Sequence, residues 1–303
     1  MRRRPRDVSD RDVLALVQRH WDEDVTAVTY LPVGFGAHHW RAEARGVPRL
    51  FVSLDLPIPR HTPASLEAAY ASAALLAETL DFVWPSLPST EVGTYTVPLE
   101  AGRVSATRWL DGRPPASITT DLAPLLDQLH ASTRPGRACE WVSTVDDHLP
   151  DQLDLLVHEP WAAGPLGEEA RALVTPRLTQ VRDWSQEHAT HLEAIDPTTF
   201  VVTHGEPGEH NQWVAGGRTY LLDWESLLLA PAERDLGTLV LSGDDAGRAD
   251  PDLIRLFDLE WRLAEIQAYT LWLAGPHDDS EDTRIALGGL RDELTRPPVD
   301  PRR

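Results

Sequence analysis

A short polar segment between two apolar runs carries side chains suited to phosphate chemistry. Glu206 precedes Asn211 within this segment, and Asp223 stands at the end of the next apolar run. Phosphoryl transfer from a nucleotide needs one acid that receives or orients the proton of an attacking hydroxyl. It also needs an amide and a second acid that hold magnesium on the phosphates. Glu206 suits the first role and the other two residues suit the second, so the pattern predicts a phosphotransferase of the kinase type.

The neighbouring residues should deliver these groups to one crevice. Residues 200–203 and 220–222 are short apolar runs typical of buried strands, and each leads into a loop. Pro207 and Gly208 disfavour a helix after the first run and so hold its loop open. They also break the helix that a His-Glu-X-X-His zinc protease requires, and the chain has no Gly-X-Ser-X-Gly elbow of a serine hydrolase.

The chain is long enough, and hydrophobic enough, to bury a large core. It has 303 residues, of which 42% are hydrophobic. The single cysteine, Cys139, excludes an intramolecular disulfide and a cysteine-rich zinc site, and we expect it to be a small apolar filler. No apolar run approaches the roughly 20 residues of a membrane span. The basic start, residues 1–6, leads into polar residues and not into a signal sequence, so a cytoplasmic location and no membrane partner are expected.

Charge narrows the choice of ligand. The formal net charge of −20 opposes nucleic-acid binding and would attract a cationic ligand, although acidic surfaces also simply favour solubility. All 28 basic residues are arginine. The absence of lysine excludes a Walker-type phosphate-binding loop, a Schiff-base lysine and the usual strand lysine of kinases.

The first part of the chain predicts an antiparallel sheet. A helix begins at Ser9 or Asp10, and a second spans residues 64–80. The turn at residues 32–37 contains Gly34 and Gly36, which would let its backbone approach a phosphate, although a Gly-X-Gly turn in a hairpin is as often only a turn. Strands are predicted at residues 25–31, 38–44, 50–54, 95–98 and 104–109.

A Gly- and Pro-rich segment at residues 111–115 marks a change of pattern. After it the periodicity is mostly helical, with Thr119 or Thr120 as the cap of the first helix and Ser280 as the cap of the last. The predicted fold class is therefore α+β, with an N-terminal nucleotide-binding part at residues 1–110 and a catalytic and acceptor-binding part at residues 111–303. Helices are predicted at residues 122–132, 145–158, 168–192, 235–241 and 251–273.

The central segment resembles the aminoglycoside phosphotransferase family, which belongs with choline kinases and protein-kinase-like enzymes. That family's pattern is His-Gly-Asp, four residues, Asn, and an Asp after a later strand, and His204, Gly205, Asn211 and Asp223 match it. The resemblance implies a two-lobed protein-kinase-like fold, ATP or GTP as co-substrate, and Mg²⁺ on Asn211 and Asp223. It implies that His204, a candidate residue of the catalytic loop, is structural there. The run at residues 230–236 resembles a helix start whose acid, Asp235, braces that loop.

Two residues depart from the family pattern. Glu206 stands where the family has Asp and reaches about one methylene further, so its loop must retract, and a misplacement of about 1 Å can cost on the order of a hundredfold in rate. Ser53 stands where the family has its phosphate-pairing lysine, and Arg41 or Arg49 is the alternative cation. Glu67 is a candidate for the helix acid that pairs with such a lysine, or else a solvated helix position. Trp109 or Thr107 falls at the adenine-binding connector.

The sequence offers several candidates for acceptor-binding residues and for the acceptor itself. The acidic cluster of residues 278, 279, 281 and 282 is either a solvated helix start or a site for an aminated sugar. The leading hypothesis is phosphorylation of a small, cationic acceptor such as an aminoglycoside or aminocyclitol antibiotic. The alternatives are an inactive pseudokinase and a metabolic kinase for an amino alcohol or sugar. The oligomeric state is left open. The tryptophans in regions that the resemblance assigns to the acceptor are Trp161, Trp184, Trp261 and Trp272.

Overall fold

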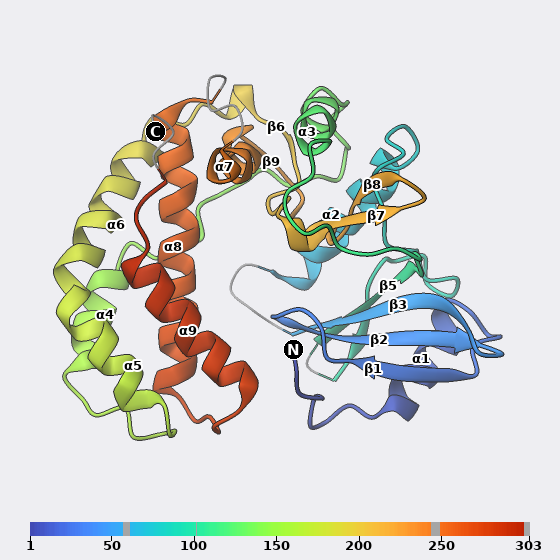
Figure 1. The fold of residues 1–303 in the computed structure, drawn as a ribbon, viewed down its shortest axis with the longest axis horizontal. Helices are drawn as coiled ribbons and strands as arrows, with labels where there is room; N and C mark the ends of the chain where they lie inside the picture. The colour runs from blue at the N-terminus through green and yellow to red at the C-terminus, as the bar shows by residue number, and fades with distance from the viewer. Residues whose placement is uncertain (57–60, 101, 244–248, 300–303) are drawn as a thin grey trace. The chain divides into compact units, whose positions relative to one another are not determined.

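Five strands near the N-terminus pair as one antiparallel sheet in the computed structural model, which describes residues 1–56, 61–100, 102–243 and 249–299 (Figure 1). The strand order is β1-β2-β3-β5-β4, and each neighbouring pair is antiparallel. The predicted sheet is confirmed. The strands are β1 (Ala27–Leu31), β2 (Ala37–Ala44), β3 (Val47–Asp55), β4 (Val97–Leu99) and β5 (Gly102–Arg108).

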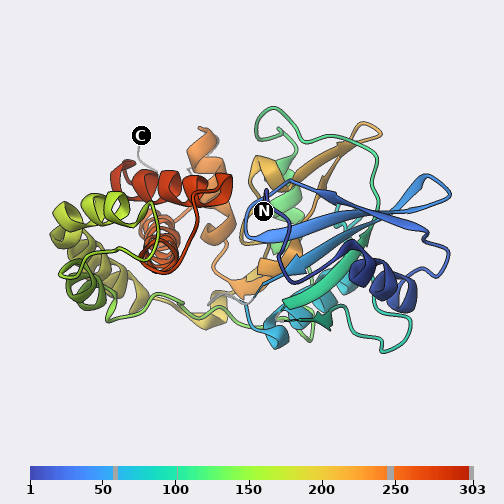
Figure 2. The ribbon, with the colours of Figure 1, turned by 90° about the horizontal axis from the view of Figure 1, so that it is seen from below.

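The two faces of this sheet have different surroundings. Alternate residues of β2 and β3, such as Trp40 and Val52, are buried in one core cluster. Helix α1 (Asp10–His20) contributes Val13 and Val17 to the same cluster, and it lies against the sheet in Figure 2. Because side chains alternate across a strand, residues between these core positions lie on the opposite face. Ser53, which lies between Val52 and Leu54, is one of them.

Helix α2 (Pro63–Leu76) follows the sheet's third strand and begins as a capped helix. Thr62 and Ser65 form a reciprocal capping box at its start. The helix ends at Leu76, four residues before its predicted end at residue 80. Beyond the helix the chain pairs with a distant strand, since Leu221 N–H donates to Phe82 O at 2.9 Å.

Two small sheets carry the segments that the sequence marked for chemistry. Strand β6 (Val201–Thr203) pairs with β9 (Leu228–Ala230), and β7 (Gln212–Ala215) pairs with β8 (Arg218–Leu221). The 3-10 turns η3 (Glu209–Asn211) and η4 (Trp224–Ser226) lie between these strands. The apolar runs at residues 200–203 and 220–222 therefore lie in strands β6 and β8, as predicted, except that Phe200 and Leu222 fall just outside them. Strands β7 and β9 were missed.

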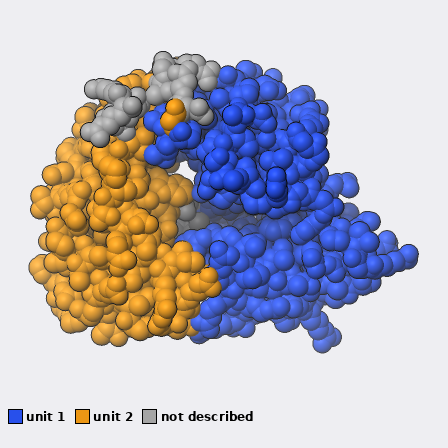
Figure 3. Space-filling view, viewed as in Figure 1, with its two compact units in different colours: residues 1–141, 199–242 blue, residues 142–198, 243–303 orange. Residues whose placement is uncertain are grey.

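The chain forms two compact units, coloured separately in Figure 3. Unit 1 is Met1–Trp141 with Thr199–Ser242, and unit 2 is Val142–Thr198 with Gly243–Arg303. Unit 1 also holds α3 (Leu122–His130) and α7 (Glu233–Ser242). The predicted functional division at residue 110 stays a prediction. The helical segments of unit 2 are α4 (Leu149–Val157), α5 (Gly167–Val174), η1 (Thr175–Arg177), α6 (Leu178–Leu192), α8 (Pro251–Ala274) and α9 (Glu281–Thr295); the short turn η2 (Pro197–Thr199) joins the units.

Unit 2 is built on one apolar cluster shared by its five α-helices. Its predicted helix at residues 168–192 is in fact two, because Pro176 lacks the N–H that a continuous helix would use, and the chain makes a 3-10 turn there. The predicted cap of α9 is confirmed, since Ser280 forms a capping box with Thr283.

Two further local predictions in the described residues are wrong. The cap of α3 is Asp121 and not a threonine, because Thr119 instead donates its N–H and hydroxyl to Gln212 Oε1. Cys139 is exposed and is not an apolar filler. In the described part of the chain, every helix is too short or too polar to cross a membrane.

Candidate active site

His204 organises the loop that follows β6. Its side chain is completely buried, its Nε2–H donates to Leu222 O at 2.8 Å, and its Nδ1 accepts the N–H of Glu206 at 3.3 Å. Burial lowers the pKa of the imidazole, which favours the neutral ring that this pair of hydrogen bonds requires. Both ring nitrogens are thus engaged inside the protein, and the two hydrogen bonds of His204 shape the loop.

Asp235, near the start of α7, holds the same loop through its backbone. Its two carboxylate oxygens accept the N–H groups of His204 at 2.9 Å and Gly205 at 2.6 Å, and His130 Nε2 donates to it at 2.9 Å. Burial alone would raise the pKa of this carboxyl, but the hydrogen bond and charge of His130, followed by His204 and Arg234, hold the pKa below its ordinary value. Asp235 is therefore an ionised brace beneath the loop.

Arg234 also contacts this loop. Its guanidinium donates to Thr203 Oγ1 at 3.0 Å and to Ser226 O at 2.9 Å. Gly205 adopts φ +95°, and a Cβ at this position would overlap the guanidinium of Arg234. The glycine is thus required both by its backbone conformation and by this contact. Sequence reasoning missed Arg234, although it directly precedes Asp235.

Asn211 and Asp223 are brought together by the β7–β8 hairpin. Gln212 pairs with Leu221, and Leu222 N–H donates to Asn211 O at 2.9 Å. Asn211 Nδ2 donates to Glu206 O at 2.9 Å, which leaves the Asn211 side-chain oxygen as the atom that could hold a cation. Asp223 adopts the left-handed conformation, with φ 61° and ψ 64°. Such strain in a residue other than glycine is typical of functional sites.

Carboxyl groups gather around Asp223. Although Asp223 is exposed, the protein atoms packed around it, followed by the charges of Glu225 and Asp55, raise its pKa well above the usual range. Burial and Glu225 likewise raise the pKa of Asp55, whose Oδ2 lies 3.4 Å from the hydroxyl of Tyr70. Acids that repel one another in this way are stabilised by a nearby cation.

The donor set near Asn211 fits magnesium better than a protein-only metal cage. Within the residues that the structure describes, no group of three or more His, Cys, Asp or Glu side chains is arranged to hold a metal. Magnesium commonly binds through one or two protein oxygens and completes its shell with water and substrate phosphates. One amide oxygen from Asn211 and one carboxylate from Asp223 match that requirement.

Glu206 is linked to a histidine that sequence reasoning did not assign. His210 Nε2 donates to Glu206 Oε1 at 2.9 Å, and the side chains are 59% and 34% exposed, respectively. The hydrogen bond to Glu206 raises the pKa of His210. The spacing of four residues was the available signal, but such a pair is predictable only when the turn between its members is known.

The glycine hairpin lies beside Ser53, the position of the expected lysine. Gly34 and Gly36 have φ values of +69° and +99°. His39 Nδ1 lies 3.0 Å from Ser53 Oγ, and a Cβ at Gly34 would lie 3.0 Å from His39 Nε2. Burial lowers the pKa of His39 to about 4, so its ring is neutral near pH 7. Its ring also stacks on Phe51 at a centroid distance of 4.9 Å.

The alternative cations lie in other ion pairs. Arg41 Nε is 2.6 Å from Glu43 Oε1, and Arg49 Nε is 3.1 Å from Asp22 Oδ2. Glu67 accepts the N–H groups of Tyr95 and Thr96 at 3.0 Å, so this helix acid holds the chain before β4. After β5, Trp109 is half-buried and donates to Asp111 at 2.9 Å. Thr107 pairs with Phe51 across β3 and β5.

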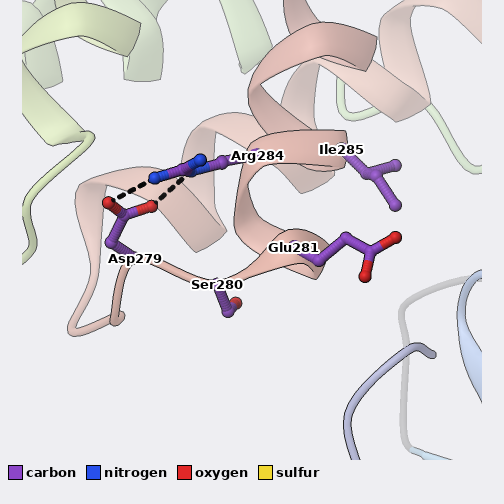
Figure 4. A pocket seen from close by; sticks show the side chains of 5 residues that line it. All are labelled: Asp279, Ser280, Glu281, Arg284 and Ile285. Atoms are coloured by element: carbon purple, nitrogen blue, oxygen red, sulfur yellow. Dashed lines mark hydrogen bonds and ion pairs between the residues drawn. The ribbon is translucent and has the colours of Figure 1, made fainter.

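The residues considered for acceptor binding lie in unit 2, where they separate into core and surface. Trp161 and Trp184 are buried in the apolar cluster, which is a packing role, whereas Trp261 and Trp272 are half-buried. The acidic cluster borders a hollow of about 510 Å³ (Figure 4). There Asp279 accepts from Arg284 at 2.6 and 2.8 Å, which lowers the pKa of Asp279 and offsets its charge. The hollow is lined by Asp279, Ser280, Glu281, Arg284 and Ile285.

Comparisons with known proteins agree on the class. The model of the phosphotransferase enzyme family matches residues 28–275. Protein StrN of Streptomyces griseus is 25% identical over 327 residues, covering 97% of this chain and 95% of that protein. Among solved structures, spectinomycin phosphotransferase APH(9)-Ia with ADP and spectinomycin has a TM-score of 0.73 at 13% identity, covering 97% of this chain and 96% of that one. A microcompartment-associated aminopropanol kinase has a TM-score of 0.58 at 17% identity, covering 94% and 95%.

The family match covers most of the chain, so this protein belongs to the phosphotransferase enzyme family. It is a phosphotransferase, as the central segment predicted. The likeness to the solved structures confirms the predicted α+β, two-lobed protein-kinase-like fold.

Proposed function

We propose that this enzyme transfers the terminal phosphoryl group of ATP or GTP, with Mg²⁺, to a hydroxyl of a small cationic acceptor. The observation that carries the proposal is that hydrogen bonds hold Glu206, Asn211 and Leu222, which precedes Asp223, around one buried histidine, His204. Glu206, Asn211 and Asp223 are the acid, the amide and the second acid that phosphoryl transfer requires.

Each group has a separate task in the proposed reaction. Glu206, which is partly exposed, accepts the proton of the acceptor hydroxyl while that oxygen bonds to phosphorus and the bond to the nucleotide's leaving oxygen breaks. Asn211 and Asp223 would hold Mg²⁺, which when bound orients the phosphates and neutralises their charge. Backbone near Gly34 and Gly36 would approach the phosphates. His204 and Asp235 set the loop geometry without touching the substrate.

An aminoglycoside or aminocyclitol antibiotic is the leading acceptor. Its amino groups suit a chain of net charge −20, because an acidic protein raises the encounter rate of cations. The structural neighbour named for spectinomycin supports an antibiotic acceptor at the level of analogy. The neighbour named for aminopropanol supports the alternative of a metabolic kinase for an amino alcohol. A cytoplasmic location is part of this proposal.

The test is nucleotide consumption with Mg²⁺ over a panel of aminocyclitols, aminoglycosides, amino alcohols and sugars. Mass spectrometry identifies the phosphorylated acceptor, and parallel assays with ATP and GTP identify the nucleotide. We expect turnover with at least one aminated acceptor and its loss in Asp223→Ala, with Glu209→Gln as a matched acidic control. Binding of Mg-nucleotide without turnover of any acceptor would instead support the pseudokinase, for which Ser53 and Glu206 are the relevant departures.

A further inference from the structure

Glu206 needs a restraint that a shorter acid would not need. Glutamate has one more rotatable bond than aspartate, so fixing its carboxylate costs more side-chain entropy. A catalytic group works well only when its position is correct to well within about 1 Å. Among the residues that the structure describes, the restraint seen on this carboxylate is the hydrogen bond from His210.

We propose that His210 is a positioning residue, which holds Glu206 Oε1 so that the other carboxylate oxygen is directed at the acceptor hydroxyl. This inference rests on the proposed function, because it assumes that Glu206 accepts the hydroxyl proton. In this proposal His210 contacts the catalytic acid, Glu206, and does not contact the phosphates or the metal.

The loop is shaped to place the imidazole against Glu206. A Cβ at Gly208 would lie 2.7 Å from His210 Cε1 and 2.9 Å from Nδ1, so the ring packs directly on the glycine backbone. The turn of η3 brings the ring back toward Glu206, and it is closed by the hydrogen bond from Asn211 N–H to Gly208 O at 3.0 Å. Asn211 Nδ2 then ties the turn to Glu206 O at 2.9 Å.

Gly208 has a backbone conformation that other residues also adopt, so it can be replaced to test the position of His210. Its φ of −61° and ψ of 170° are open to alanine. The main obstacle to a methyl group at this position is therefore the ring of His210. A Gly208→Ala protein should fold and move the imidazole away from Glu206.

The decisive experiment is a double-mutant cycle on kcat. His210→Ala should lower kcat by roughly ten- to a hundredfold, with the nucleotide KM within about twofold. His210→Gln, which keeps a donor, should recover most of the loss. In a Glu206→Asp background, His210→Ala should change kcat by less than about twofold, because the shorter acid does not reach the ring. Gly208→Ala should act as His210→Ala does, and the two changes together should lose no more than either alone.

Two results would overturn the inference: an equal loss from His210→Ala in both backgrounds, or a gain in kcat when His210 is removed. Exposed ion pairs contribute little to folding, so a changed melting temperature would point to a structural role instead. Failure of the proposed function looks different, since turnover would then survive Glu206→Ala or be absent from the unmodified enzyme.

The contact can also be measured without turnover. In the protein labelled with ¹⁵N at histidine, Glu206→Gln should shift the ring resonances of His210, whereas Asp252→Asn, at an exposed position of unit 2, should leave them within the line width. Unchanged resonances in Glu206→Gln would remove the contact and the proposal with it.

Discussion

His39 and Ser53 face each other across β2 and β3, with His39 Nδ1 3.0 Å from Ser53 Oγ. Ser53 occupies the position at which the resemblance predicts a lysine. The pair lies on the sheet face opposite α1 and beside Gly34 of the glycine hairpin. Both His39 and Ser53 can form hydrogen bonds and are uncharged near pH 7, because the low pKa of His39 keeps its ring neutral.

We expect this pair to contribute to nucleotide affinity. Both His39→Ala and Ser53→Ala should raise the nucleotide KM by about three- to tenfold, because each removes hydrogen-bonding capacity beside the hairpin. Effects on kcat should be smaller. His148→Ala, at an exposed position before α4, is the matched control and should leave both constants unchanged. A nucleotide KM that stays at its original value in both variants would show that the pair does not face the nucleotide.

Removal of magnesium should abolish nucleotide binding almost completely. Ser53 supplies no positive charge, so the metal is the main neutralising charge for the phosphates. ATP or GTP should raise the melting temperature in the presence of Mg²⁺ and lose most of that effect when EDTA is added. Asp223→Asn should behave as EDTA does, while the exposed Asp252→Asn should not. An equal nucleotide-induced shift with and without metal would contradict the assignment.

Replacement of Asp235 by Asn should damage both the loop and the fold. In the unmodified protein, the N–H groups of His204 and Gly205 donate to the two carboxylate oxygens of Asp235. An asparagine would replace one of these oxygens by an N–H₂ group, which cannot accept a hydrogen bond. Leaving a buried donor unsatisfied costs about 1–3 kcal/mol. We expect kcat to fall at least tenfold and the melting temperature to fall by several degrees, measured by steady-state kinetics and calorimetry. Asp252→Asn serves as control, and a fully active, equally stable Asp235→Asn protein would rule out the brace.

The acid stability of unit 2 should depend on Glu260 of α8. Its carboxylate accepts from Ser143 Oγ at 2.6 Å, Thr144 N at 2.8 Å and His188 Nε2 at 2.7 Å. Burial opposes ionisation, but these partners lower the pKa below 4.5. The folded state therefore binds this proton less readily than the unfolded state. Its stabilisation is fully present above pH of about 4.5 and is lost as pH falls through the lower folded pKa.

Melting temperature against pH checks this prediction. Glu260→Gln should melt several degrees below the unmodified protein at pH 7, and the difference should shrink steadily below pH of about 4.5. Asp252→Asn again provides the control. A difference that is constant from pH 7 to pH 3 would show that the carboxylate charge is not responsible.

The parts of the molecule that sequence predicted are those with local signals. Capping residues Ser9 and Ser280 begin their helices as expected, and the strands predicted at residues 38–44 and 50–54 are present as β2 and β3. The central loop was predictable because its acid and amide are close in the chain.

The parts that were missed depend on distant contacts. His130 meets Asp235 and Glu67 meets Tyr95, and no spacing rule links such partners. Trp161 could not be assigned to the core until the helices around it were placed. The break at Pro176 was a different error, since the proline itself was a visible signal for it.

Residues 199–242 return to the unit that begins the chain, after 142–198 have entered the other one. A ribosome therefore releases the first part of unit 1, with its five-stranded sheet, before the segment that completes the unit. Until Asp235 has emerged, β6, the loop at His204 and the brace from Asp235 cannot all be in place in unit 1. Maturation of the reactive centre should consequently be a late event in biosynthesis, governed by slow closure of contacts between remote stretches of chain.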